Sequence, residues 1–294
     1  MPAIDKSMQG KICMVTGANS GIGKETALGL ARKGATVVMV SRDPARGEAA
    51  QNEIKAQSGS NNVDLLLADL ASQQSIRQLV ENFQSRYSQL HVLINNAGTF
   101  TLNRRETVDG LEVTFAVNYL APFLLTNLLL DTLKASAPAR IINVSSDAHQ
   151  QGYINLDDLQ SKQSFPLMRA YGQSKLALIM FTYDLARRLQ DTDVTANALH
   201  PGFVATNFAQ SAVPALLRPL VRLVMAIPGI SSEEGAKTSI YLASSPDVEG
   251  VTGRYFVKSI PVRSAPITYD EALQQKLWEE SAKLVKLPVK GVKS

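Results

Sequence analysis

Tyr171 and Lys175 have the residue types and the spacing needed for proton transfer. Two residues four apart on a helix share one face, so the phenol and the ammonium group would be neighbours. A phenol titrates near 10, which makes it a poor acid–base group at neutral pH. A positive charge about 4 Å away stabilises the phenolate by about 4 kcal/mol at an effective dielectric constant of about 20, or roughly three pKa units. We therefore expect Lys175 to lower the pKa of Tyr171 towards neutrality, where acid–base transfer is efficient.

A glycine-rich turn lies near the start of the chain, between a predicted strand at 11–16 and a predicted helix at 21–33. It reads G-A-N-S-G-I-G over residues 17–23. Glycines let the backbone approach a pyrophosphate, and the start of a helix offers N–H groups and the positive end of its dipole. The spacing G-x-x-x-G-x-G differs from the dinucleotide-binding fingerprint G-x-G-x-x-G. Its place between a strand and a helix nevertheless favours phosphate binding over a plain tight turn.

Predicted strands and helices alternate along most of the chain. Strands joined by helices predict an α/β fold, a Rossmann-type doubly wound parallel sheet of about seven strands with helices on both faces. The helix over 111–133 should be interrupted near 118–122, and Asp43 should cap the helix that begins at Pro44. The expected strands are 11–16, 36–40, 63–68, 92–95, 140–144, 194–199 and 253–257, and the other expected helices are 44–57, 72–87, 170–189 and 233–244.

Several motifs occur together in one order and resemble those of the short-chain dehydrogenase/reductase family. They are the glycine-rich turn, N-N-A-G at 95–98, the serine pair at 145–146, Y-x-x-x-K at 171–175 and P-G at 201–202, within about residues 10–257. Further stretches resemble the retinol dehydrogenase-like branch of that family: I-N-V-S-S-x-A-H at 142–149, E-E-G-A at 233–236, Y-L-A-S at 241–244, G-R-Y-F at 253–256 and L-W-E-x-S at 277–281.

The resemblance implies an oxidoreductase that moves a hydride between a nicotinamide cofactor and an apolar aldehyde, ketone or alcohol, including retinoid-like molecules. It assigns acid–base chemistry to Tyr171, whose pKa Lys175 would lower with the assistance of an oxidised nicotinamide. It favours Ser146 over Ser145 as the group that holds the substrate oxygen. It also gives Asn118 the task of interrupting its helix and holding a water that leads to Lys175. A non-catalytic NADP-binding regulator on the same fold is the alternative, and a nucleotide-sugar epimerase would need a larger C-terminal substrate domain.

The cofactor is expected to be NADP(H), with NAD(H) possible. NAD-binding folds carry an acidic residue after the second strand, where this chain has Arg42, with Arg46 one helical turn further on; both suit a 2′-phosphate. Asp43 argues the other way, but it is better explained as a helix cap. The expected cofactor-binding residues are Gly17, Asn19, Ser20, Gly21, Ile22, Gly23, Arg42, Arg46, Asp69, Leu70, Asn95, Ala97, Gly98, Tyr171, Lys175, Pro201, Gly202 and Thr206.

An apolar stretch at about 203–230 contains three prolines and falls where the family has its substrate lid. Contact with a membrane surface and ordinary core packing are the other interpretations. Ser146, Phe203 and Phe208 are expected to contact substrate, and His149 either lines the substrate mouth or is a simple loop residue. We expect one catalytic domain over 1–258, including this lid, and a C-terminal helical extension over 259–294.

Composition excludes several other classes of function. The net charge of +4 comes from dispersed basic residues, so a nucleic-acid groove is not expected. One cysteine and three histidines without ligand spacing predict neither a disulfide framework nor a metal site. The polar start predicts a cytoplasmic protein, and the uncharged stretch 113–130 is interpreted as a buried helix rather than a membrane span. The resemblance implies a possible homodimer through the helices near 120–133 and 170–189.

Overall fold

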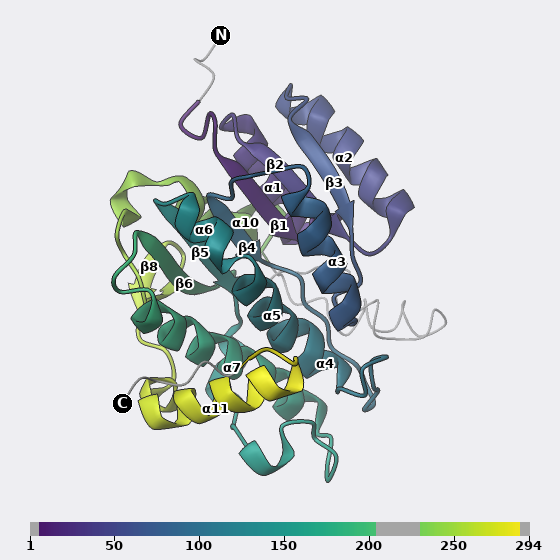
Figure 1. Cartoon of the computed structure of the whole chain (residues 1–294), viewed down its shortest axis with the longest axis vertical. Helices are drawn as coiled ribbons and strands as arrows, with labels where there is room; N and C mark the ends of the chain where they lie inside the picture. The colour runs from purple at the N-terminus through teal and green to yellow at the C-terminus, as the bar shows by residue number, and fades with distance from the viewer. Residues whose placement is uncertain (1–5, 204–229, 289–294) are drawn as a thin grey trace.

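The computed structural model describes residues 6–203 and 230–288. One eight-stranded sheet runs through it in the order β3-β2-β1-β4-β5-β6-β7-β8 (Figure 1), with β8 antiparallel to β7 and all other neighbours parallel. The strands are β1 Ile12–Thr16, β2 Thr36–Ser41, β3 Val63–Leu67, β4 Val92–Asn95, β5 Ala139–Val144, β6 Val194–His200, β7 Tyr255–Val257 and β8 Ile260–Val262.

Helices cover both faces of the sheet, each over its own apolar core. One face packs against α1, α2 and α10. The other packs against α3, α5 and α7, and α11 lies on the outer side of α7. Within the described residues the helices are α1 Gly21–Arg32, α2 Pro44–Ser58, α3 Gln73–Gln84, α4 Val113–Phe115, α5 Ala121–Leu128, α6 Leu130–Ala135, α7 Leu167–Arg188, α10 Ser232–Ser244 and α11 Glu271–Leu284. Short helical turns are η1 Ala116–Leu120, η2 Asp147–Gln151, η3 Leu156–Asp158, η5 Pro246–Val248 and η6 Pro266–Tyr269.

The doubly wound parallel sheet is confirmed, with one strand more than expected. Strand β8 is an exposed edge strand of only three residues, and its central Pro261 argues against a strand in a prediction from sequence. The predicted interruption near 118–122 is a π-helical turn, η1, immediately before Pro122 in α5. Asp43 caps α2 as expected, since its carboxylate accepts the N–H of Arg46 at 3.0 Å.

The C-terminal helix α11 lies across α5 and α7 (Figure 1). Its Trp278 ring lies 4.9 Å from the ring of Phe123 and 5.6 Å from that of Phe181, measured between centroids. The guanidinium of Arg188 stacks 4.0 Å above the same indole, a cation–π contact. The helix therefore completes the aromatic core under α7 instead of lying apart from the domain.

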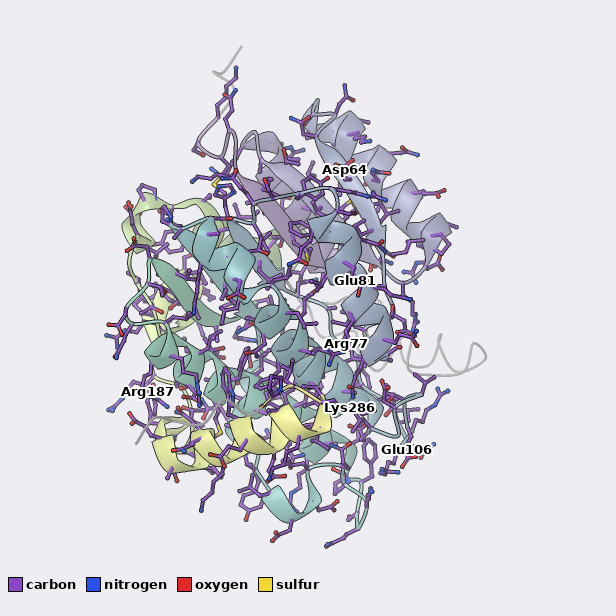
Figure 2. All side chains as sticks on the ribbon, viewed as in Figure 1. Asp64, Arg77, Glu81, Glu106, Arg187 and Lys286 are labelled. Carbon is purple, nitrogen blue, oxygen red and sulfur yellow. The ribbon has the colours of Figure 1, made fainter. Side chains whose placement is uncertain are left out.

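Polar contacts hold α11 near each of its ends, where Figure 2 labels Arg187, Arg77 and Lys286. Arg187 of α7 donates to the side-chain oxygen of Gln274, and Arg77 of α3 donates to the carbonyl of Val285 at 2.9 Å. Helix α11 thus covers Phe123 of α5 and Phe181 of α7, the two helices through which the resemblance implied a homodimer. The dimer stays a prediction. No helix in the described part of the chain is both long and apolar enough to cross a membrane.

We predict that Trp278→Ala lowers the free energy of unfolding by about 3 kcal/mol, because it removes an indole that fills the space between Phe123, Phe181 and Arg188. Chemical denaturation followed by circular dichroism measures the change. Lys276→Ala, at an exposed position of the same helix, is the control and should cost under about 0.5 kcal/mol. Equal losses in the two variants would contradict the packing role of α11.

Candidate active site

The predicted site residues converge because the parallel strands all end at one edge of the sheet. The turns after β1, β2, β3 and β4 carry the expected cofactor contacts, the turn after β5 carries Ser146, and Pro201 and Gly202 follow β6. In open α/β sheets, ligands bind outside this carboxyl edge, where the strand order reverses. Here the order reverses between β1 and β4.

Helix α7 meets the turn after β5 at a close backbone contact. A Cβ atom on Gly172 would lie 2.8 Å from the carbonyl oxygen of Ala148, and one on Gly152 would lie 2.5 Å from the carbonyl oxygen of Gly172. Both distances are too short for a side chain. The two glycines therefore allow the neighbouring Tyr171 to reach Ser146.

The phenol of Tyr171 and the hydroxyl of Ser146 are hydrogen-bonded. Burial raises the pKa of Tyr171, and this hydrogen bond to Ser146 opposes the rise. The net direction of the pKa shift of Tyr171 is therefore upward. The lowering of this pKa by Lys175 together with an oxidised nicotinamide stays a prediction. The ring of Phe100 lies 6.3 Å from that of Tyr171, edge-on, and adds apolar surface beside the phenol.

Lys175 does lie beside Tyr171, but its ammonium group is engaged elsewhere. Its Nζ donates to the carbonyl oxygen of Val144 at 2.9 Å and lies 5.9 Å from the centre of the Tyr171 ring. Burial lowers the pKa of Lys175 to about 8, since a charged ammonium is costly to remove from water. The lysine thus has a donor aimed at the end of β5, close to the serine pair.

The structure distinguishes the two serines. The hydroxyl of Ser145 is buried and donates to the backbone carbonyl of Lys175 at 2.9 Å, so it fastens β5 to α7. The hydroxyl of Ser146 accepts the N–H of Ala148 at 3.2 Å and pairs with Tyr171. Of the two, Ser146 has the hydroxyl beside the phenol, as the resemblance implied.

Asn118 lies in the π-helical turn, completely buried, and it links three segments. Its amide exchanges two hydrogen bonds with the backbone of Thr99, at 2.7 and 2.9 Å, and donates to the hydroxyl of Ser174 at 3.0 Å. Ser174 in turn donates to the carbonyl of Tyr171 at 2.7 Å. Sequence reasoning missed Ser174, although its place one turn after Tyr171 could have suggested it. The water path to Lys175 stays a prediction.

The glycine-rich turn has the backbone shape of a phosphate cradle. Gly17 and Gly21 have φ angles of +67° and +56°, which L side chains rarely adopt. A Cβ atom on Gly23 would lie 2.4 Å from both the Gly17 carbonyl oxygen and the Nδ2 of Asn96. The first turn of α1 thus sits directly on the loop, with its N–H groups available for a pyrophosphate, and the turn fits the expected nucleotide.

Thr16 and Asn96 hold this turn, and sequence reasoning missed both. The Thr16 hydroxyl accepts the N–H groups of Asn96 and Ala97 at 3.0 Å each, and the Asn96 amide donates to the Thr16 carbonyl at 2.8 Å. They join the β1 turn to the N-N-A-G segment after β4. The sequence did contain a signal for this contact, because Thr16 ends β1 and Asn96 follows β4, the neighbouring strand.

The expected adenosine-binding residues stand where strands β2 and β3 end. Arg42 and Arg46 are exposed after β2, while the carboxylate of Asp43 is used as the cap of α2. The carboxylate of Asp69 accepts the N–H of Ala71 at 3.0 Å, which shapes the turn after β3 that includes Leu70. Two cationic side chains therefore flank this corner of the site.

Two predicted contacts need correction. The side chain of Asn95 is buried and donates to Thr126 of α5 at 3.0 Å and to Asn143 of β5 at 2.8 Å, so it joins β4 to these two elements instead of facing a ribose. His149 is fully buried with both ring nitrogens bonded to backbone groups, so it does not line a substrate mouth. Phe203 is 54% exposed beside the β6 end, whereas Thr206, Phe208 and most of the expected lid lie outside the described residues.

Neither a metal nor a reactive thiol is found in the part of the chain that the structure describes. It contains no group of three His, Cys, Asp or Glu side chains that could hold a metal ion. Cys13 lies buried in β1, and burial raises the pKa of its thiol to about 12. The thiol therefore stays protonated and unreactive at neutral pH.

Comparison with known proteins agrees with this geometry. The family model described as short chain dehydrogenase matches residues 11–216. The chain is a short-chain dehydrogenase. Human retinol dehydrogenase 14 is 46% identical to this short-chain dehydrogenase over 95% of the chain and 88% of its own length. Human polyprenol dehydrogenase is 42% identical over 93% and 84%. The Pseudomonas aeruginosa RhlG/NADP active-site complex is 27% identical, with a TM-score of 0.67 over 86% of this chain and 96% of that one.

Family membership makes this short-chain dehydrogenase an oxidoreductase, in a family that uses NAD(P)(H). The retinol dehydrogenase-like resemblance is confirmed by the relatives. Neither the relatives nor the described site supports the non-catalytic alternative. Ser146 bonds the phenol of Tyr171, Lys175 lies beside its ring, and Asn118 is linked to its backbone through Ser174.

We predict that Gly23→Ala weakens binding of the nicotinamide cofactor at least about tenfold, or about 1.4 kcal/mol, because the new methyl group pushes α1 away from the turn. Titration calorimetry measures the affinity. Gly29→Ala on the same helix is the matched control, since its Cβ would meet only the movable end of Ile240. Unchanged affinity in the Gly23 variant would argue against a phosphate cradle here.

Proposed function

We propose that this short-chain dehydrogenase is NADP(H)-dependent and interconverts apolar carbonyl compounds and alcohols, with Tyr171 as the acid–base group. The observation that carries the proposal is the hydrogen-bonded pair of Tyr171 and Ser146 at the carboxyl edge of the sheet. Two hydroxyl groups side by side can hold one substrate oxygen, and one of them can exchange a proton with it.

Each residue has a defined part in the reaction. Ser146 orients the substrate oxygen, and Tyr171 donates a proton to it during reduction or removes one during oxidation. Lys175, held by Val144, keeps a cationic donor behind the phenol. Asn118 and Ser174 fix the backbone of Tyr171. When bound, the nicotinamide supplies or accepts the hydride.

The preference for NADP(H) is supported by charge at the end of β2. Arg42 and Arg46 are exposed there, and the carboxylate that would otherwise bind ribose hydroxyls caps α2. An arginine pairs with a phosphate through strong charge-assisted hydrogen bonds. The similar Pseudomonas aeruginosa structure is a complex with NADP, which agrees with this preference.

An apolar substrate is supported by the names of the relatives and by side chains beside the phenol. Retinol and polyprenol, named for two relatives, are largely hydrocarbon alcohols. Phe100 lies edge-on to Tyr171, and Phe203 exposes half of its surface at the end of β6. Apolar surface of this kind favours a hydrocarbon over a small polar substrate.

We predict that Tyr171→Phe lowers kcat at least about 100-fold, the size of a lost general acid–base group, while NADP(H) affinity changes only a few fold. Steady-state rates with a panel of apolar aldehydes and ketones, together with cofactor titration, provide the measurement. Tyr241→Phe is the control, because Tyr241 lies in α10 on the opposite face of the sheet. A Tyr171 variant with most of its activity would contradict the proposed role.

Cofactor choice provides a separate test. We predict that Arg42→Asp shifts the preference from NADP(H) towards NAD(H) by at least tenfold in kcat/KM, since a carboxylate repels the 2′-phosphate and accepts from ribose hydroxyls. Arg86→Asp makes the same charge change at an exposed position at the far end of α3 and should leave the preference unchanged. A wild-type protein that already prefers NAD(H) would overturn this assignment.

A further inference from the structure

Each ring nitrogen of the buried residue His149 has a backbone partner. Its Nδ1 lies 2.8 Å from the carbonyl oxygen of Ser146, and the N–H of Ala265 points at its Nε2 at 3.1 Å. A carbonyl oxygen can only accept and an amide N–H can only donate. The ring must therefore be neutral, with its proton on Nδ1.

These two bonds connect distant parts of the chain to the active site. Ser146 precedes η2 and presents its hydroxyl to Tyr171, whereas Ala265 follows β8 and precedes η6. Ala265 is itself well anchored, because its neighbour Ser264 bonds the hydroxyl of Tyr183 in α7 at 2.7 Å. His149 thus ties the serine turn to a segment that is held by the same helix as Tyr171.

We propose that His149 is a positioning residue that holds the Ser146 turn against the Ala265 segment, and that protonation of its ring releases this connection and lowers the reaction rate. A second ring proton would sit on Nε2 and face the N–H of Ala265, donor against donor. The cation would then have to leave the buried space, and the Ser146 carbonyl would lose its donor. The inference rests on the proposed function, in which Ser146 orients the substrate oxygen.

The surroundings of the ring favour its neutral form. Burial lowers the pKa of His149, and the bond to Ser146 and the nearby Asp147 oppose this shift only in part. From β6, His200 also faces this region. Burial lowers the pKa of His200, Asp147 opposes this shift, and a charge on His149 would lower the pKa further. From β7, the ring of Tyr255 packs edge-on at 4.9 Å, and its neutral phenol adds no charge.

Because the pKa of His149 is lowered in the folded protein, its effect on stability and rate appears at acid pH. A histidine that is neutral in the folded state contributes stability at pH values above its ordinary pKa of about 6.5. This contribution is lost as the pH falls through the lower pKa that the histidine has in the folded state. The wild-type kcat should therefore fall about tenfold per pH unit below that value, while the affinity for the cofactor stays unchanged.

Two substitutions separate the two bonds. His149→Asn places an amide N–H near the position of Nδ1, so it keeps the bond to Ser146 and cannot titrate. His149→Gln places its amide near Nε2, so it can accept from Ala265 but loses the bond to Ser146. We expect the Asn variant to keep kcat within about threefold and to lose the acid limb, that is, the fall of kcat at low pH. We expect the Gln variant to lose more than tenfold in kcat at every pH.

The other two histidines of the chain are matched controls. His91 accepts the N–H of Ile12 and His200 accepts that of Asp147, each through Nδ1, and an asparagine oxygen can replace either acceptor. His91→Asn and His200→Asn should keep the acid limb of kcat. An acid limb that survives in His149→Asn, or equal rates in His149→Asn and His149→Gln, would overturn the proposal.

A measurement without turnover separates this inference from the proposed reaction. Nitrogen NMR of the wild-type histidine rings should show His149 as the Nδ1–H form at pH 8, and amide exchange at Ala265 should accelerate as that signal titrates. A ring protonated on Nε2, or exchange at Ala265 that is independent of the titration, would overturn the inference even in an active enzyme. If no carbonyl compound is reduced at any pH, the proposed reaction fails, while the NMR result still decides the role of His149.

Discussion

The backbone contact between α7 and the turn after β5 is the constraint on which the site depends. Gly172 and Gly152 let these two segments approach until neither can carry a side chain at the point of contact. Ser145, which bonds the carbonyl of Lys175, fixes the same approach from the end of β5. A methyl group at either glycine would move the phenol of Tyr171 away from Ser146, so packing and chemistry depend on the same contact.

Buried polar side chains keep the elements around this contact in register. Asn95 in β4 bonds Thr126 in α5 and Asn143 in β5, and Asn143 donates to Thr182 in α7 at 2.9 Å. Such groups are costly to bury without partners, so any shift of α7 along the sheet would leave several of them unbonded. This chain of amides and hydroxyls therefore sets the position of the helix that carries Tyr171 more strictly than apolar contacts would.

The sequence was most informative where a local rule applied. Alternation predicted the parallel sheet, the Asp43–Pro44 pair predicted a cap, and the stretch 118–122 was predicted to interrupt its helix. It was least informative where the outcome depends on burial in three dimensions. The upward pKa of Tyr171, the inward-facing amide of Asn95 and the enclosed ring of His149 all follow from neighbours that are distant in the chain. The surface strand β8 is too short, and is interrupted by Pro261, so the sequence does not predict it.

The position of α11 has a consequence for the order in which the protein is synthesised. Its Trp278 covers Phe123 and Phe181, yet it is translated about 150 residues after Phe123, roughly 10 to 30 s later at ordinary elongation rates of about 5 to 20 residues per second. During that interval the growing chain holds an aromatic surface whose cover does not yet exist. The helix of Tyr171 and Lys175 therefore acquires its final packing only after α11 has been synthesised.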